Sequence, residues 1–415
     1  MADDLLISSD THLYEPGDLW TTRLPRHLRE RGLRSVPIPN SEAVYHKGLE
    51  RHYCPNALDM ASGRASHIDG KVMDFCVDDS DEVLRRFEAD LAADGVSGAV
   101  IYPNNGMVAF LPDHELALAH ARVYNDYVVE VFGKHLKRYA PAAIIPLTDV
   151  GDAVAEIERV AKMGLRNINV PVLPPKPYNT SVYDKVWATA QANDLVVSFH
   201  VGTGFDENHV EGFEEAFKMI AGAASMSDMI GIATSTRVLQ FMGGQHTAER
   251  AIASLVCSGV MERFPDLHFC TVEFNAYWLA SLVAAIEAAY VEFTGQDDQY
   301  PVGHFDPNRR MNDQPRMVKA YAMKWMFPLR PREYIARQVH STFMNDPVAL
   351  AWRNQMGLSV QSFLWGNDYP HNEGTWPNSK KVVGSLFADI PAADRSAILG
   401  GTTAKLFGLE PAACC

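Results

Sequence analysis

Carboxylate and imidazole side chains stand at the ends of several short apolar runs in this chain. They are Asp10 and His12 in LLISSDTHLYEP (residues 5–16), His200 in VVSFHVG (196–202) and Asp368 in FLWGNDYPH (363–371). Side chains two residues apart on a strand point to the same side, so Asp10 and His12 would project together. A catalytic divalent metal needs several converging nitrogen and oxygen ligands. The pattern predicts a metal site, although each residue taken alone is more often structural: a surface loop residue or a hydrogen-bonded core histidine.

Eight short apolar runs, most of them followed by a loop and a helical pattern, must position these side chains. They span 5–12, 97–103, 139–146, 167–172, 195–202, 267–274, 338–344 and 362–371. Strands that alternate with helices indicate βαβ units and a parallel sheet. Eight such strands close a (β/α)8 TIM barrel, whose catalytic residues come from the carboxyl ends of several strands. We expect this α/β fold. A doubly wound sheet is the alternative, and the absence of a GxGxxG motif after the first strand weakens it.

Three connections between the runs are too long for plain βα loops. The chain is expected to form one domain over residues 1–415, with insertions at about 13–96, 203–250 and 288–333. Long loops are usually functional or disordered, and in a barrel they build the active-site face. We therefore expect a lid or substrate wall, while residues 300–331 would equally suit a contact in a homodimer.

The composition excludes several classes of partner. The 415 residues are 47% hydrophobic and 21% charged, with a formal net charge of −14 and no basic patch, so nucleic-acid binding is not expected. No apolar stretch is long enough to cross a membrane, and the start lacks the features of a signal peptide. The six cysteines show no CxxC spacing, which is typical of reduced thiols in a cytoplasmic protein. A small-molecule substrate is the expected partner.

Four motifs together make the chain resemble the amidohydrolase superfamily, in the branch of metal-dependent TIM-barrel hydrolases and decarboxylases. They are DTHLYEP (10–16), FH (199–200), ERFPDLHF (262–269) and WGNDYPH (365–371). The resemblance implies one divalent metal ion bound by Asp10, His12, His200 and Asp368. Superfamily members often carry H-x-H in the first motif, whereas this chain has D-x-H. The added hard oxygen donor makes Mn²⁺ more acceptable, but Zn²⁺ is the expected ion.

The chain departs from the decarboxylases of this branch at the sixth run. Those enzymes usually carry a catalytic histidine about six residues past FPDL, where this chain has Glu273. Glu273 is interpreted as a general acid/base, a ligand of a second ion, or a buried structural carboxylate. His246, in GGQHTAER, and His340, in QVHSTFM, are candidates to replace the missing imidazole, and a core position is favoured for His340.

Two further residues lie beside the predicted ligands in the sequence. Glu15 follows His12 closely and is expected near the metal, or bonded to backbone N–H groups of its own loop. His371 follows Asp368 and is expected to bind substrate or to orient that aspartate, with an ordinary loop histidine as the alternative.

Three functions fit these residues. The first is a hydrolase in which a metal-activated water cleaves a C–C, amide or ester bond next to a carbonyl, with Asp368 moving the proton. The alternative is a non-oxidative decarboxylase (a lyase) of an aromatic or unsaturated carboxylic acid. The third is a barrel that binds a ligand without catalysis. The aromatic residues of the long loops suit a small aromatic or bulky apolar substrate.

Overall fold

A parallel sheet with eight strand positions forms the centre of the molecule. The computed structural model describes residues 5–16, 18–37, 44–47, 65–68, 71–74, 79–104, 113–204, 222, 224–294, 325–371 and 374–411. The strands of the sheet are β1 (Ile7–Ser8), β2 (His12–Leu13), β7 (Gly98–Pro103), β8 (Tyr139–Ile144), β9 (Asn167–Val170), β10 (Val196–His200), β11 (Phe269–Val272), β12 (Val339–Phe343) and β13 (Phe363–Trp365). They pair in parallel in the order β1-β7-β8-β9-β10-β11-β12-β13, and β2 also pairs with β7.

Backbone hydrogen bonds between the first and the last strand close the sheet into a barrel. The Ser9 N–H donates to the Trp365 carbonyl at 3.0 Å, and the Asp368 N–H donates to the Asp10 carbonyl at 2.9 Å. The His12 N–H donates to the carbonyl oxygen of Tyr369. We call these three bonds the seam. The (β/α)8 barrel expected from the eight apolar runs is therefore confirmed.

The first strand contains one more residue than its partner. Ser8 pairs with Ala99 and His12 pairs with Tyr102, so the chain takes four steps (8 to 12) where β7 takes three (99 to 102). An extra residue of this kind is a β-bulge, which bends the strand and re-aims its side chains. The bulge lies between β1 and β2, where Asp10 is found.

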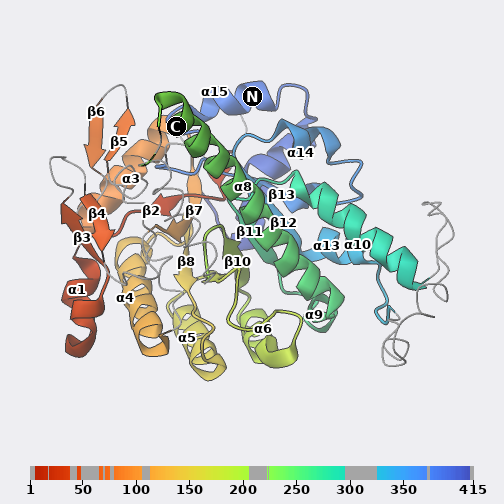
Figure 1. Ribbon diagram of the computed structural model, residues 1–415, viewed down its shortest axis with the longest axis horizontal. Coiled ribbons are helices and arrows are strands. Elements are labelled where there is room, and N and C mark those ends of the chain that lie inside the picture. The colour runs from red at the N-terminus through yellow and green to blue at the C-terminus, as the bar shows by residue number, and fades with distance from the viewer. Residues whose placement is uncertain are drawn as a thin grey trace.

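Helices cover the outside of the barrel, and Figure 1 shows α4, α5 and α6 along one side of the strands. The longer helices are α3 (Ser80–Asp94), α4 (His114–Phe132), α5 (Val150–Lys162), α6 (Asp184–Ala192), α8 (Met226–Cys257), α10 (Trp278–Thr294), α13 (Pro331–Gln338) and α15 (Ser379–Leu386). The shorter ones are α1 (Leu19–Arg23), α9 (Val260–Arg263), α14 (Pro347–Trp352), α16 (Ala392–Ser396) and α17 (Thr402–Phe407). Asp79, Asp113 and Asp149 cap α3, α4 and α5 by accepting backbone N–H bonds from the first turn.

Alternation along each strand decides which side chains enter the barrel. On β10, Val197 and Phe199 belong to the large apolar cluster shared with the helices, whereas Val196 belongs to the smaller cluster inside the barrel. His200 therefore points inward, at the carboxyl end of its strand. The smaller cluster fills the barrel with apolar side chains such as Ile7 and Leu364 from other strands. Because apolar side chains fill the barrel interior, the polar residues at the strand ends lie at its carboxyl-terminal end.

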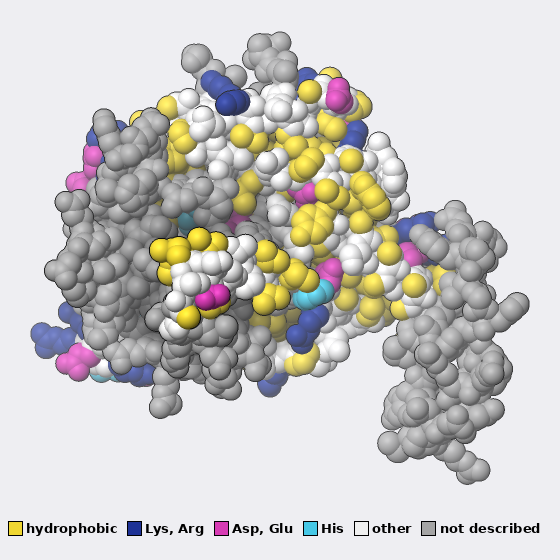
Figure 2. All heavy atoms as spheres, turned by 45° about the horizontal axis from the view of Figure 1, so that its top comes forward, with side chains coloured by type: hydrophobic (Ala, Val, Ile, Leu, Met, Phe, Trp, Pro, Cys, Tyr) yellow, Lys and Arg dark blue, Asp and Glu magenta, His cyan; other side chains and the backbone are white. Residues whose placement is uncertain are grey.

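The described parts of the long insertions add elements beside the barrel. Residues 13–96 contain α1, α3 and two antiparallel hairpins, β3 (Arg34–Pro37) with β4 (Val44–Lys47), and β5 (Ala65–Ile68) with β6 (Lys71–Asp74). In the later part of α8 one face is buried, with Ala248, Ile252 and Leu255. Between Met226 and Met242 the helix has large exposed apolar side chains: Met226, Ile230, Val238, Leu239 and Met242. Figure 2 shows hydrophobic side chains on one face of the molecule.

The single-domain organisation with its three insertions stays a prediction, and part of each insertion lies outside the described residues. Among the residues that are described, none of the helices has both the length and the apolar character that a membrane crossing requires.

Candidate metal centre

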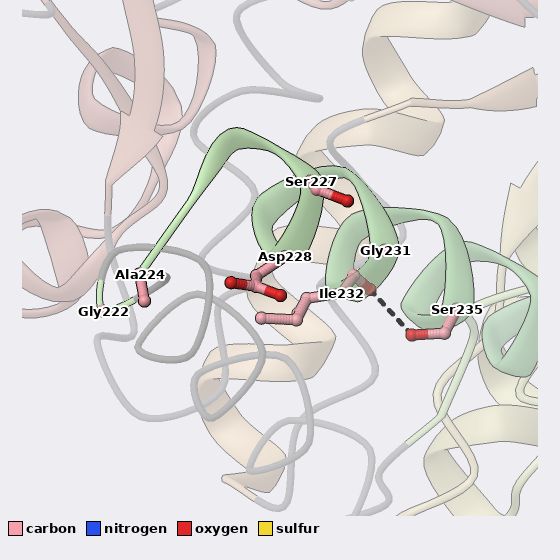
Figure 3. A pocket seen from close by; sticks show the side chains of 7 residues that line it. All are labelled: Gly222, Ala224, Ser227, Asp228, Gly231, Ile232 and Ser235. Carbon is pink, nitrogen blue, oxygen red and sulfur yellow. Dashed lines mark hydrogen bonds between the residues drawn. The ribbon is translucent and has the colours of Figure 1, made fainter.

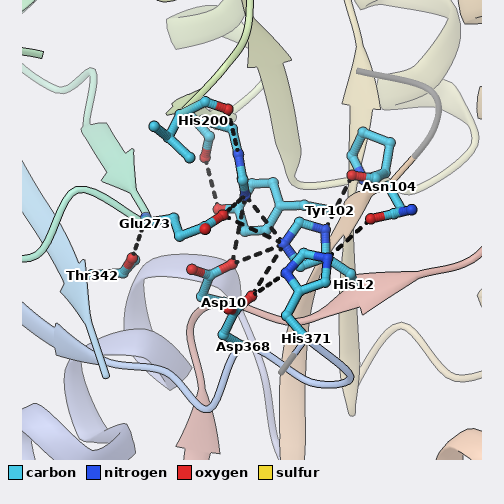
Figure 4. Close-up of polar contacts among 12 residues, drawn as sticks. Asp10, His12, Tyr102, Asn104, His200, Glu273, Thr342, Asp368 and His371 are labelled. Atoms are coloured by element: carbon cyan, nitrogen blue, oxygen red, sulfur yellow. Dashed lines mark hydrogen bonds and ion pairs between the residues drawn. The ribbon is translucent and has the colours of Figure 1, made fainter. Parts of the chain in front are cut away.

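The four predicted ligands lie together at the carboxyl ends of their strands (Figure 4). The Nε2 atom of His12 is 3.3 Å from Nε2 of His200 and 3.4 Å from Oδ1 of Asp368. Oδ1 of Asp10 is 3.7 Å from both Nε2 atoms. All four residues are at most 1% exposed. Three separate strand ends therefore bring two imidazoles and two carboxylates to one buried point.

Backbone carbonyls fix the orientation of both imidazoles. Nδ1 of His12 lies 3.1 Å from the carbonyl oxygen of Pro103, and Nδ1 of His200 lies 3.0 Å from that of Val201. A carbonyl only accepts, so each Nδ1 carries the hydrogen and each Nε2 presents its lone pair to the cluster. Burial, together with the nearby His371 and His200 rings, lowers the pKa of His12 well below its ordinary value, which keeps that ring neutral. Neutral Nε2 atoms oriented in this way are able to coordinate a metal ion.

Three carboxylate oxygens of the cluster lack a hydrogen-bond partner among the described residues. They are both side-chain oxygens of Asp10 and Oδ2 of Asp368. A buried carboxylate without a partner is costly, so such groups are usually paired or coordinate a metal. Two nitrogen ligands that each lie ~2.1 Å from one ion are themselves roughly 3 Å apart, as the two Nε2 atoms are here. The donor set therefore fits a divalent cation.

Glu273 approaches the same point from the end of β11. Its Oε2 atom is 3.5 Å from Nε2 of His200 and 4.0 Å from Nε2 of His12. Its backbone N–H donates to the Thr342 hydroxyl at 2.9 Å. Glu273 and Asp368 have φ angles of 66° and 53°, in the left-handed region that non-glycine residues rarely adopt. Backbone strain of this kind clusters at functional sites, and here it aims two carboxylates at the imidazoles.

His371 connects Asp368 to a loop on the opposite side of the cluster. Its Nδ1 lies 2.8 Å from Oδ1 of Asp368, and its Nε2 lies 2.9 Å from Oδ1 of Asn104. The His371 ring also packs against the His12 ring at a tilt of 36°, with 4.1 Å between ring centroids. The backbone N–H of Asn104 donates to Oε1 of Glu15, which is fully buried. His371 thus contacts both Asp368 and Asn104, and Glu15 contacts the backbone of Asn104.

Two groups of these residues have the spacing of metal ligands among the described part of the chain. One contains Asp10, His12 and His200; the other contains His12, Glu273, Asp368 and His371. The groups share His12 and together form what we call the metal cluster. The metal-binding and catalytic roles assigned to its members from the sequence stay proposals.

The structure does not bring two other histidines to this cluster. His246 lies on α8 with a side chain that is 70% exposed, and its Nδ1 contacts Oε2 of Glu249 at 3.0 Å. His340 is buried at the other end of its strand, where it contacts the His268 ring at 3.0 Å and the Gln361 carbonyl at 2.7 Å. His340 thus occupies the core position favoured from the sequence, and no geometry supports the catalytic role suggested for His246.

A polar layer lies beneath the cluster, inside the barrel. The Tyr102 hydroxyl lies 3.1 Å from Oγ of Ser198 and accepts from the Asn167 amide at 3.3 Å, and Ser198 donates to Oδ1 of Asn167 at 2.7 Å. The Tyr102 ring lies 5.3 Å from the His200 ring. Burial raises the pKa of Tyr102 well above its ordinary value, so its hydroxyl stays protonated. Sequence inspection missed Tyr102 and Asn104, although both lie at the end of the apolar run 97–103.

A separate hollow lies against the first turns of α8, lined by Gly222, Ala224, Ser227, Asp228, Gly231, Ile232 and Ser235 (Figure 3). None of the metal-cluster residues is among the described residues that line it, and its polar side chains, Ser227, Asp228 and Ser235, lie along the first three turns of α8. This hollow carries no catalytic constellation.

Comparison with known proteins supports a family assignment. A family model described as Amidohydrolase matches residues 98–320, more than half of the chain. No curated protein sequence matches it. Among solved structures, an amidohydrolase from Mycobacterium avium subsp. paratuberculosis K-10 has a TM-score of 0.69 and 20% identity, covering 98% of this chain and 100% of that chain.

Two further solved structures are decarboxylases. The 5-carboxyvanillate decarboxylase of Sphingomonas paucimobilis has a TM-score of 0.60 and 16% identity over 98% of this chain and 99% of its own. The dihydroxybenzoic acid decarboxylase of Polaromonas sp. JS666, which holds manganese and the inhibitor 2-nitroresorcinol, has a TM-score of 0.59 and 16% identity over 99% of both chains. At these sequence identities the solved structures support a shared fold only. The family model is matched by the amino-acid sequence itself and therefore supports membership of the family. The chain belongs to the amidohydrolase family.

Proposed function

We propose that the protein is a metal-dependent decarboxylase that removes CO₂ from an aromatic or unsaturated carboxylic acid without oxidation. The observation that carries this proposal is the position of Glu273, a carboxyl group 3.5 Å from an imidazole of the cluster and 16% exposed. Decarboxylation needs an acid that can reach a substrate carbon, and Glu273 stands where the resemblance leads one to expect a catalytic histidine. The decarboxylases among the structures of similar fold support the same reaction class.

Each residue has a definite task in this reaction. Asp10, His12, His200 and Asp368 would hold a divalent ion, which supplies positive charge to bind the substrate carboxylate and a neighbouring oxygen. Protonated Glu273 donates its proton to the carbon that bears the carboxylate. The bond to the carboxyl carbon then breaks, CO₂ leaves, and the electron pair of that bond returns to the substrate. Glu273 recovers a proton from water at its exposed edge.

The donor set bears on the identity of the ion. Two aspartates supply hard oxygen donors, and Glu273 adds a third carboxylate within reach of the imidazoles. Such donors suit Mn²⁺ better than a nitrogen-rich or sulfur-rich site would. We therefore propose Mn²⁺ beside the Zn²⁺ expected from the sequence, and the manganese in the Polaromonas enzyme supports this choice.

Asp368 supports a hydrolase as the second candidate. Nδ1 of His371 lies 2.8 Å from its Oδ1 atom, while Oδ2 is buried and lacks a hydrogen-bond partner among the residues that the structure describes. A carboxylate held on one oxygen can use the other to take a proton from water and return it to a leaving group. This is the role that the sequence assigns to Asp368 in a hydrolase, and the amidohydrolase from Mycobacterium avium shares the fold.

Product analysis separates the two reactions. The metal-loaded protein is incubated in D₂O with a panel of hydroxybenzoic acids and other unsaturated acids, and separately with amides, esters and β-diketones. A decarboxylase releases CO₂ and leaves deuterium on the vacated carbon, and Glu273→Gln loses this activity while it retains the metal. A new carboxylate, amine or alcohol without CO₂ would establish the hydrolase instead. Full decarboxylation by Glu273→Gln would refute the assigned acid.

A further inference from the structure

The side-chain amide of Asn169, at the carboxyl end of β9, has no hydrogen-bond partner within the described part of the chain. Asn169 is 0% exposed, and neither its Nδ2 nor its Oδ1 atom contacts a polar group there. Other buried amides of the chain are bonded: Asn125 contacts the Ile144 backbone and Glu156, and Asn367 accepts from the Ser8 hydroxyl. An unpaired buried amide is costly, and natural proteins rarely keep one unless it has a use.

Strand geometry places this amide next to the metal cluster. Asn167 and Asn169 lie two residues apart on β9 and share its inner face. The Asn167 amide is bonded within the polar layer, to Ser198 and Tyr102, so Asn169 lies one step nearer the carboxyl end of the barrel. Asn169 pairs in register with Ser198, which comes two residues before His200 on β10. The unpaired amide therefore lies between the polar layer and the level of the ligands.

We propose that Asn169 is a specificity-determining residue whose amide binds a hydroxyl group of the substrate. This rests on the proposed function, in which the metal cluster takes the carboxylate and one neighbouring oxygen and leaves the amide for another substituent. An amide offers one acceptor oxygen and N–H donors on the same planar group. A hydroxyl both donates and accepts, so it satisfies both atoms, whereas a carboxylate only accepts and would leave Oδ1 unpaired. The substrate class is accordingly an aromatic acid that carries at least one hydroxyl group.

The first test is thermal stability, which does not depend on activity. Asn169→Leu replaces an unpaired amide with an apolar group of similar size, and we expect its melting temperature to equal or exceed that of the wild type. Asn167→Leu is the matched control on the same strand and face, and should melt several degrees lower because it removes two hydrogen bonds. A loss of stability in Asn169→Leu as large as in Asn167→Leu would show that the amide is structural and overturn the proposal.

The second test is binding of two unreactive probes to the metal-loaded protein by calorimetry. 2-Nitroresorcinol carries hydroxyl groups beside a nitro group that stands in for the carboxylate, and nitrobenzene lacks the hydroxyls. The wild type should prefer 2-nitroresorcinol roughly tenfold or more. Asn169→Leu should lose a large part of that preference while it retains the metal, because the ion still favours one neighbouring hydroxyl. An unchanged preference, or no binding of 2-nitroresorcinol to the wild type, overturns the inference. Neither test requires the release of CO₂. Failure of the proposed reaction can therefore be distinguished from failure of the role proposed for Asn169.

Discussion

His12 and His200 face each other with their Nε2 atoms 3.3 Å apart, and each ring donates its Nδ1 hydrogen to a backbone carbonyl. Neither Nε2 can therefore donate to the other, and two lone pairs meet beside the unpaired carboxylate of Asp10. Only a cation, whether a metal ion or a proton, makes this arrangement favourable. The predictions below begin from this pair.

His200→Ala should abolish stoichiometric metal binding, because it removes one imidazole from a site whose ligands are preoriented. Metal content by mass spectrometry should fall from near one ion per chain to a small fraction of that value. His246→Ala is the matched control, since that ring is exposed and lies on Glu249. Retention of one ion per chain by a folded His200→Ala protein would exclude His200 as a ligand.

Removal of the metal should destabilise the fold. A ligand that binds only the folded state at 100 times its dissociation constant adds about 3 kcal/mol to the free energy of unfolding. We expect the melting temperature to fall by several degrees after dialysis against a chelator and to recover with added Mn²⁺ or Zn²⁺. An identical melting temperature before and after chelation would argue against an ion at this site.

Asn104→Ala should weaken metal binding without removing a ligand. Its Oδ1 atom holds Nε2 of His371, which in turn holds Asp368, and loss of such a supporting contact typically costs 10–100-fold in metal affinity. Competitive titration with a chromogenic chelator measures the affinity directly. Asn193→Ala is the control, because that amide is exposed and bonds to a helix carbonyl. Equal affinity in Asn104→Ala and the wild type would remove Asn104 from the support of the site.

Gly366→Ala should disturb the seam and the metal cluster together. A Cβ atom at Gly366 would lie 2.7 Å from Cβ of Asp10 and 2.9 Å from its backbone nitrogen. Backbone cannot move away cheaply there, so we expect lower stability and lower metal affinity in the same variant. A Cβ atom at Gly231 on α8 meets nothing within 4 Å, so Gly231→Ala should leave the metal affinity unchanged and should not lower the stability. A Gly366→Ala protein that melts and binds metal like the wild type would show that the contact relaxes freely.

His340 should make the stability depend on pH. Burial, with the neighbouring His268 ring, lowers the pKa of His340 to about 4 from 6.5. The unfolded chain therefore binds a proton between these values that the folded chain does not, so stability is complete above pH 6.5 and falls as the pH drops toward 4. The loss is roughly 3 kcal/mol. Urea titrations between pH 7 and 4 should show a shallower decline for His340→Gln than for His27→Gln, whose ring is exposed. Equal slopes would contradict this account.

Most of the sequence-based prediction came from two features: the apolar runs that mark the strands, and the polar residues at the ends of those runs. The position of His200 follows from an apolar run that ends in one polar residue, and this pattern depends only on the chain's own periodicity. Asp368 and His12 were recognisable for the same reason. Strands of a parallel barrel are buried on both faces, so each one appears in the sequence as a short apolar run. Such local runs were therefore sufficient to predict the barrel.

Contacts between distant loops were not predictable in the same way. Nothing in the sequence near Asn104 indicates that its amide contacts His371, because the contact depends on how two loops meet after the barrel closes. The approach of Glu273 to the imidazoles depends on a left-handed backbone conformation, which the surrounding sequence does not predict. His246 shows the converse, since a histidine in a polar motif lies on an exposed helix face.

The seam has a consequence for the order of events during synthesis. Asp10 lies just past β1 and Asp368 just past β13, and the hydrogen bond between their backbones joins segments that are far apart in the sequence. The ligands therefore converge only after the chain has left the ribosome through the last strand of the barrel, since no earlier fragment contains both. Metal binding is therefore a late step that follows closure of the barrel. A chain truncated before its last strand would leave the ribosome without a bound ion.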